Sequence, residues 1–215
     1  MIEPAALLAW SALALIVTLT PGPDTLLVAA HAARGGFRAG MAALMGIMTG
    51  VIWYGSLIAF GLLSVLVAVP ALFLAVKIAG ALYLAWLGFG MIRRALVPPA
   101  SSRQTDTAGK MPAVQLGQPY AQGFFTNALN PKVALFYLAA LPQFAGSGAD
   151  APMIGLLLLA IHAVFGFMWL SFIAFAAARA ARSFAWKGAV VRWLEGAIGA
   201  FFVGVAGRLA LAQVR

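Results

Sequence analysis

The chain has no cysteine, two histidines and five acidic residues among 215 residues. Without cysteine there can be no disulfide, thiolate metal site or cysteine nucleophile, and two histidines are too few for a histidine-rich metal-transport tract. We therefore expect neither a metal site nor a cofactor. Five acids are also few for an ATP-driven pump, so a transporter of this composition should draw its energy from a gradient or from a partner.

Enzyme signatures are also missing. The sequence contains no G-x-S-x-G, no H-E-x-x-H, no phosphate-binding P-loop and no paired catalytic carboxylates. We expect no enzymatic activity. The formal net charge is +9, but no run of Lys and Arg with interleaved aromatics resembles a nucleic-acid surface, so we expect no nucleic-acid partner.

Apolar residues are what the chain has in excess. Its hydrophobic fraction is 64% and its charged fraction 9%, whereas soluble domains are about 45–50% apolar and about 25% charged. A soluble core of this size could not hide so much apolar surface, so the main partner of the chain should be the lipid bilayer. At about 20 residues per crossing, the length suits six transmembrane helices.

Six apolar segments can be marked along the chain, and they predict an all-α membrane protein. The start, Met1-Ile2-Glu3-Pro4, has an acid and no basic residue, so we interpret the first segment as a retained span rather than a cleaved signal. The segments cover about 5–33, 39–63, 70–92, 121–144, 153–178 and 193–212.

The first and fourth segments are interrupted by proline. Pro21 and Pro23 lack an N–H and clash with the preceding helical turn, so the stretch from Thr20 through Gly22 to Asp24 predicts a helix break. Freed carbonyls are costly in lipid, so the break should face the protein interior.

The second interruption lies at Asn130-Pro131-Lys132. Asn130 suits the N-cap of a new half-helix and Pro131 its first position. Paired interruptions at corresponding places in two halves are the best sequence indication of a transport site.

Asp24 and Lys132 lie beside these two breaks, and intramembrane charge is usually functional. The two could neutralise each other, or they could open to a zwitterion, with Asp24 holding an ammonium and Lys132 a carboxylate. Asp24 could instead carry a coupling proton. The structural alternatives are that Asp24 caps a helix and that Lys132 extends to the cytoplasmic face.

Other polar residues are weaker candidates. Asn127, Thr126 and Gln143 flank the fourth segment's break or its exit and could line a polar path. His162 could relay protons, but a hydrogen-bonded structural histidine is the simpler interpretation. Glu195 should pair with Arg192 or Lys187.

The two halves of the chain resemble each other weakly. Pro23-Asp24 matches Pro131-Lys132, and Gly80-Ala81 with Gly88 matches Gly196-Ala197 with Gly204, in the same order. Three spans per half would insert the halves in opposite senses, which predicts two inverted three-helix repeats in one membrane domain, 1–215. The first repeat would cover about 1–92 and the second about 120–215, joined by a cytoplasmic linker at about 93–119.

Glycines four residues apart also indicate close helix packing. They are Gly36 with Gly40, Gly46 with Gly50, and Gly196 with Ala200 and Gly204.

The Lys and Arg residues predict the orientation of the spans. With both termini outside, ten of the fourteen basic residues are cytoplasmic, as the positive-inside rule requires. The ten are Arg34, Arg38, Arg93, Arg94, Arg103, Lys110, Arg179, Arg182, Lys187 and Arg192.

At these motifs the chain resembles the LysE/RhtB family of amino-acid exporters. Thr20-Pro21-Gly22-Pro23-Asp24 is similar to that family's first-span signature. The stretches 128–136 and 141–144 are similar to its fourth-span signature, and Gly80 to Leu84 with Gly88 to its third-span pattern.

The resemblance implies a multi-pass protein of the bacterial cytoplasmic membrane that exports amino acids or close derivatives, driven by the proton gradient. It implies that Pro21, Gly22 and Pro23, and Asn130, Pro131 and Lys132, carry family motifs. A passive channel, or an exporter of another small polar solute, is the alternative. The sequence leaves open which amino acid is carried, which ion couples transport, and whether the chain forms a homo-oligomer.

Overall fold

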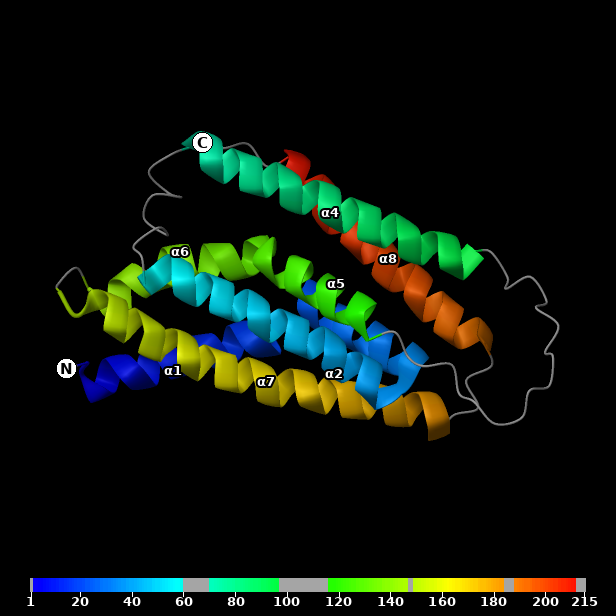
Figure 1. The fold of residues 1–215 in the computed structure, drawn as a ribbon, viewed down its shortest axis with the longest axis horizontal. Coiled ribbons are helices and arrows are strands. Elements are labelled where there is room, and N and C mark those ends of the chain that lie inside the picture. Colours follow the sequence, from blue (N-terminus) through cyan, green and yellow to red (C-terminus); the bar gives the residue numbers. More distant parts are fainter. Residues whose placement is uncertain (1, 60–69, 97–115, 147–148, 184–187, 212–215) are drawn as a thin grey trace.

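The computed structural model describes residues 2–59, 70–96, 116–146, 149–183 and 188–211. Within these residues the chain forms helices and no strand, which confirms the all-helical expectation (Figure 1). The helices are α1 (Pro4–Leu19), α2 (Pro23–Ala59), α4 (Pro70–Leu96), α5 (Gly117–Ala128), α6 (Pro131–Ala145), α7 (Ala151–Ser183) and α8 (Gly188–Leu211).

Proline marks the start of four of these helices: Pro4, Pro23, Pro70 and Pro131. Its fixed φ suits the first helical turn, and its missing N–H would have had no partner inside the helix at that position. The breaks expected in the first and fourth segments are therefore present, between α1 and α2 and between α5 and α6.

Helix α2 is two arms joined by a turn at Gly36, whose φ is 75°. A Cβ on Gly40 would lie 2.8 Å from the Cβ of Ala32, whereas residues eight apart in a straight helix are about 12 Å apart. The chain therefore doubles back at Gly36, where positive φ favours glycine. The first arm covers 23–35 and the second 37–59, which separates the first and second apolar segments where the sequence predicted.

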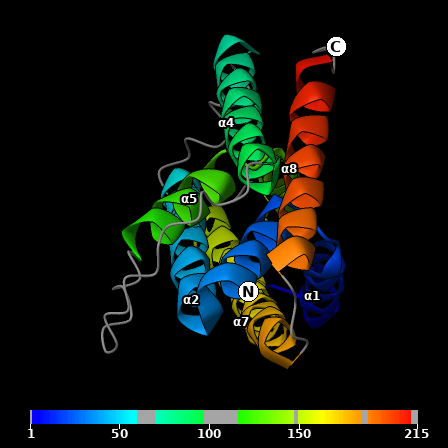
Figure 2. The ribbon, with the colours of Figure 1, turned by 90° about the vertical axis from the view of Figure 1, so that its right-hand side faces the viewer.

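The helices run along a common long axis (Figure 1). The ends of α4 and α7 and the start of α8 lie towards the right-hand end of that view. Helix α4 packs along α8, and both stand on one side of the remaining helices (Figure 2). The linker expected at about 93–119 lies mostly outside the described residues; α4 extends to Leu96 and α5 begins at Gly117.

Three apolar cores hold this arrangement together. The first joins α1, the second arm of α2, α6 and α7 around Trp10 and Tyr137; the second joins the first arm, α4 and α8 around Leu27 and Phe202. The third joins both arms of α2 to α7 around Ala174. The first arm of α2 thus contacts the pair formed by α4 and α8 as well as α7 and the second arm.

Glycines allow the closest helix contacts. A Cβ on Gly46 would collide with the backbone of Tyr120, and one on Gly50 with Asn127, which confirms the packing role expected for this pair. Helices α4 and α8 cross where Gly88 faces Gly199.

Two glycine expectations were wrong. Gly36 forms the turn described above rather than a packing contact. An added Cβ on Gly204 would have no neighbour within 4 Å among the described residues, whereas one on Gly199 would collide with α4. A spacing of four identifies one face of a helix, but it cannot say which face the neighbouring helix occupies.

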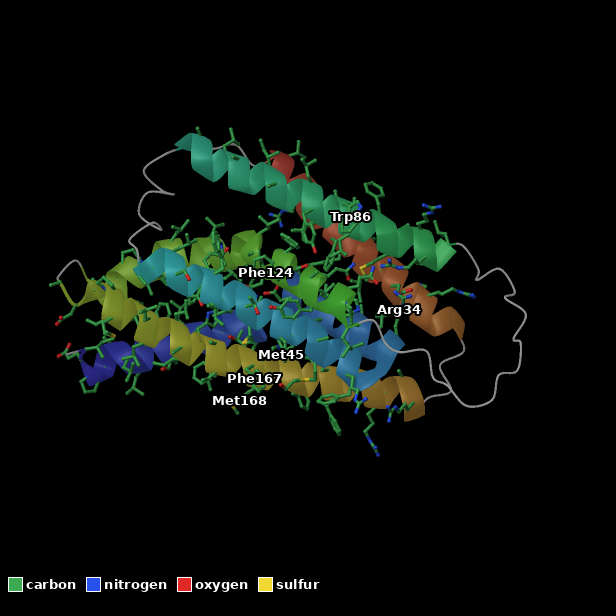
Figure 3. All side chains as sticks on the ribbon, viewed as in Figure 1. Arg34, Met45, Trp86, Phe124, Phe167 and Met168 are labelled. Carbon is green, nitrogen blue, oxygen red and sulfur yellow. The ribbon has the colours of Figure 1, made fainter. Side chains whose placement is uncertain are left out.

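Large apolar side chains cover the outside of the bundle. Leu8 is 73% exposed, Trp86 65% and Met168 64%; Figure 3 shows Met168 pointing away from the bundle. By length and composition, Ala151–Arg182 is long and apolar enough to cross a bilayer, and so is Pro23–Ala59 when its two arms are counted together. An apolar exterior of this extent is suited to lipid rather than to water.

Candidate functional site

The two helix breaks meet at a central cavity of about 60 Å³. Its walls come from the end of α1, both arms of α2, the break between α5 and α6, and α7. Of the predicted site residues, Gly22, Asp24, Asn127, Asn130 and Lys132 line the cavity. Thr20, Pro21 and Pro23 shape the first break and are not among the lining residues, and Pro131 starts α6 at the second break. The polar residues that line it are Thr18, Asp24, Thr25, Asn127, Asn130, Lys132, His162 and Trp169.

Asp24 lies in the first turn of α2, where the helix dipole favours a negative charge. Its Oδ2 accepts a hydrogen bond of 2.8 Å from Asn127 Nδ2, across the two breaks. Its Oδ1 is buried and has no hydrogen-bond partner among the described residues. The carboxylate therefore joins the two halves through one oxygen, while the other oxygen has no partner among the described residues.

Asn127 is positioned by a glycine on the neighbouring helix. Its side chain is 2% exposed, and a Cβ on Gly50 would lie 2.6 Å from its Oδ1. Only a residue without a side chain leaves room for the amide there. Gly50 thus determines where Asn127, and through it Asp24, can lie.

Lys132 does not contact Asp24 directly. Its Nζ donates to the carbonyl of Val17 at 2.7 Å and to that of Thr20 at 2.5 Å. In a continuous helix the Val17 carbonyl would accept from the N–H of residue 21, but Pro21 has none. Lys132 supplies the missing donor from 111 residues further along the chain.

The position of the Lys132 ammonium also explains how a lysine can occupy the first turn of α6, where the helix dipole disfavours a positive charge. The ammonium lies at the C-terminal end of α1, the negative end of that helix. The side chain passes Gly22, where an added Cβ would lie 3.5 Å from Lys132 Cδ. Two of the free carbonyls expected at the first break, those of Val17 and Thr20, thus have a partner inside the protein.

Asn130 caps α6. Its side chain accepts from the backbone N–H of Lys132 at 3.0 Å, and Pro131 occupies the first helical position, which confirms the expected cap. Tyr54 O–H donates to the Ala128 carbonyl at 3.2 Å, so the end of α5 also has a partner.

Two further residues of the cavity had no recognisable signal in the sequence. Thr18 Oγ1 and Trp169 Nε1 are buried and, within the described part of the chain, have no hydrogen-bond partner. Thr18 precedes the break by two residues, and Trp169 is one of six tryptophans in an apolar chain. Only the packing of α7 against the break brings Trp169 to the cavity.

The remaining candidates have structural partners. His162 Nδ1 is hydrogen-bonded to Tyr137 O–H at 2.8 Å, as expected for a structural histidine. Gln143 Nε2 donates to the Ala139 carbonyl of its own helix. Of the three residues suggested for a polar path, Asn127 lines the cavity, and Thr126 and Gln143 are not among its lining residues.

A second polar cluster lies at the other end of the first arm. Glu195 on α8 is 5% exposed, and its Oε1 lies 2.9 Å from Arg34 Nε, which Figure 3 labels near the right-hand end. Glu195 therefore pairs with Arg34 and not with the predicted partner Arg192. The other predicted partner, Lys187, lies outside the described residues. His31 Nε2 and Gln122 Oε1, 2.8 Å apart, join the first arm to α5 beside it.

The chain matches a family model described as "LysE type translocator" over residues 15–213. An uncharacterized membrane protein of Pseudomonas aeruginosa is 34% identical over 202 residues, which is 92% of this chain and 91% of that protein. No solved structure matches the chain.

Several relatives carry functional names, of two kinds. The "Leucine efflux protein" of an Enterobacter species is 31% identical over 198 residues, covering 92% of this chain and 91% of that protein. The "Threonine efflux protein" of Salmonella typhi is 26% identical over 197 residues, covering 88% and 90%.

Proposed function

The chain belongs to the LysE type translocator family, and from that premise we propose that it exports amino acids or close derivatives across the bacterial cytoplasmic membrane. The observation that carries the proposal is the buried carboxylate of Asp24. One of its oxygens is bound to Asn127 and the other has no partner among the described residues, at a cavity where two broken helices meet. An ammonium group of a small solute would complete that site.

The relatives support the choice of cargo. Proteins named for leucine efflux and threonine efflux align over about nine-tenths of the chain. The shared part of those two cargoes is the amino-acid head group, because their side chains are respectively apolar and hydroxylated. A site that recognises the head group therefore suits the range of the family better than one that recognises a side chain.

We propose six spans in two inverted repeats. The first span would be α1 with the first arm of α2, and the fourth would be α5 with α6, each broken at the cavity. The second arm and α7 correspond in order and pack together, as do α4 and α8. Both breaks contribute to a single cavity, which is the arrangement expected of inverted-repeat transporters.

We propose that both termini are outside. The helix ends next to the basic loops lie together at one end of the bundle (Figure 1). An excess of Lys and Arg at one end favours its placement in the cytoplasm. Coupling to the proton gradient would need a group that alternates between protonated and charged states, and Asp24 is the acid that lines the cavity.

The test is an efflux screen in cells that overproduce the protein. We expect export of at least one amino acid against its gradient, abolished by an uncoupler. Asp24→Asn should remove export, while Asp150→Asn, a change at an exposed acid in the turn before α7, should not. Export that runs only down the gradient, or that survives the uncoupler, would favour a passive channel instead.

A further inference from the structure

Two residues that line the central cavity each carry a buried polar atom without a partner among the described residues, and the two atoms have opposite hydrogen-bonding character. Asp24 Oδ1 can only accept when the carboxylate is ionised, and Trp169 Nε1 can only donate. Both atoms are buried and both residues line the cavity. A ligand that satisfies both must carry a donor at one end and an acceptor at the other.

Leaving such atoms without a partner is costly. An unsatisfied buried donor or acceptor costs about 1–3 kcal/mol, and more when the group is charged. Buried polar atoms without partners are few in folded proteins, and each calls for an explanation. Four of them, on Thr18, Asp24, Asn127 and Trp169, belong to residues around this single cavity.

Lys132 would be the obvious group to bind a carboxylate, but two of its three N–H donors are already used. They bind the carbonyls of Val17 and Thr20, which the prolines of the first break leave without helical partners. Moving the ammonium to a substrate would expose those carbonyls again. A carboxylate in the cavity is therefore better received by a donor that has no other partner.

We propose that Trp169 is a substrate-binding residue whose indole N–H binds the carboxylate of the amino acid, while Asp24 and Thr18 bind its ammonium. This inference rests on the proposed function and specifies how the head group is oriented. The ammonium lies towards the break between α1 and α2, and the carboxylate lies towards α7. Trp169 then contributes to the preference for amino acids over simple amines.

The size of the cavity suits a head group. A volume of about 60 Å³ corresponds to roughly four to six buried waters at about 10–15 Å³ each. The ammonium, Cα and carboxylate of an amino acid have about the same number of non-hydrogen atoms. The rest of the wall is mainly apolar and can accommodate a side chain; it includes Val17, Ile47, Met48, Val51, Val133 and Leu170.

The test compares leucine with 3-methylbutylamine, which is leucine without its carboxylate. Each is used to inhibit leucine counterflow in proteoliposomes. Trp169→Phe keeps an aromatic ring and removes the N–H. A hydrogen bond to a charged group contributes about 1.5–3 kcal/mol, so this variant should weaken leucine binding by about 10- to 100-fold and leave amine inhibition unchanged.

Two controls make the result specific. Trp53→Phe changes an exposed tryptophan on the second arm of α2 that does not line the cavity, and it should leave both inhibition constants unchanged. Thr18→Val removes a group assigned to the ammonium, so it should weaken leucine and the amine to the same extent. Equal losses of leucine and amine in Trp169→Phe, or no loss of leucine, would overturn the assignment.

The wild-type protein gives a second measurement that does not depend on a variant folding. It should bind leucine at least tenfold more tightly than 3-methylbutylamine. Equal affinities would mean that the carboxylate makes no contact, and the inference would be wrong while the exporter proposal stood. A wild-type protein that carries neither leucine nor threonine nor any other amino acid would refute the exporter proposal itself.

Discussion

Replacing Lys132 by Met separates a structural role of this lysine from a role in substrate binding. Methionine keeps an unbranched apolar stem of similar length and removes the ammonium. The stem can still lie along Gly22, but the carbonyls of Val17 and Thr20 lose their donor. Because Pro21 has no N–H, the backbone group that would donate to Val17 in a continuous helix cannot replace that donor.

The expected loss of stability follows from these two hydrogen bonds. A hydrogen bond from a charged donor contributes about 1.5–3 kcal/mol, so two of them set an upper range of about 3–6 kcal/mol. The bond to Thr20 lies at an exposed position, where water can replace the donor. We therefore expect Lys132→Met to lower the free energy of unfolding by about 2–4 kcal/mol, with most of the loss at Val17.

The assay is thermal unfolding of the purified protein in detergent, monitored by helical circular dichroism. For a chain of this length about 1 kcal/mol corresponds to about 2–4 °C, so Tm should fall by about 4–16 °C. Lys132→Arg keeps the charge and several N–H donors on a side chain of similar reach, so it should recover most of the stability.

Two results would refute this reasoning. If Lys132→Met unfolded at the wild-type temperature and nevertheless lost transport, the ammonium would act on substrate rather than on the helix break. If Lys132→Arg were as unstable as Lys132→Met, donation to the two carbonyls would not be the stabilising contact.

Two further predictions concern a glycine beside the site and the ion pair at the other end of the first arm. Gly50→Ala should lower export at least tenfold, because its Cβ would lie 2.6 Å from Asn127 Oδ1 and displace the partner of the site carboxylate; the matched change Gly55→Ala, whose nearest neighbours are 3.7 Å away, should not. Glu195→Gln should lower the free energy of unfolding by about 1–2 kcal/mol, measured by thermal unfolding, because it leaves the half-exposed Arg34 without its charge partner. Export equal to wild type in Gly50→Ala, or an unchanged Tm in Glu195→Gln, would contradict the respective argument.

The fold could be predicted where the cause is local. Pro23 and Pro131 start helices because proline suits the first turn, and Asn130 caps α6 because its side chain reaches an N–H two residues away. The chain also reverses in the charged gap between the first two apolar segments, although the sequence did not identify Gly36 as the turning residue. Each of these features depends on a few adjacent residues, so the sequence pattern is sufficient to find them.

The details of the site depend on contacts between distant segments. The sequence places Asp24 and Lys132 at corresponding breaks, but it cannot say that each binds elsewhere, Asp24 to Asn127 and Lys132 to the end of α1. Trp169 is equally unpredictable, because one apolar face of α7 resembles the others. Where helices are apolar on all sides, periodicity does not identify the inward face.

The ion pair of Glu195 shows the same limit in another place. Its sequence neighbour Arg192 is the natural choice for a partner, since residues three apart share a helix face. The structure instead joins Glu195 to Arg34, because the first arm of α2 packs against α8 at that end of the bundle. Pairing by sequence distance fails where helices from different parts of the chain are in contact.

The most direct test of the account is counterflow of leucine and threonine in proteoliposomes that contain the purified protein, compared with Asp24→Asn. We predict that the wild-type protein exchanges at least one of the two amino acids. The Asp24→Asn protein, folded and inserted to the same extent, should exchange neither above the level of empty vesicles. Wild-type rates in the Asp24→Asn protein would contradict the assignment of the central cavity as the substrate site.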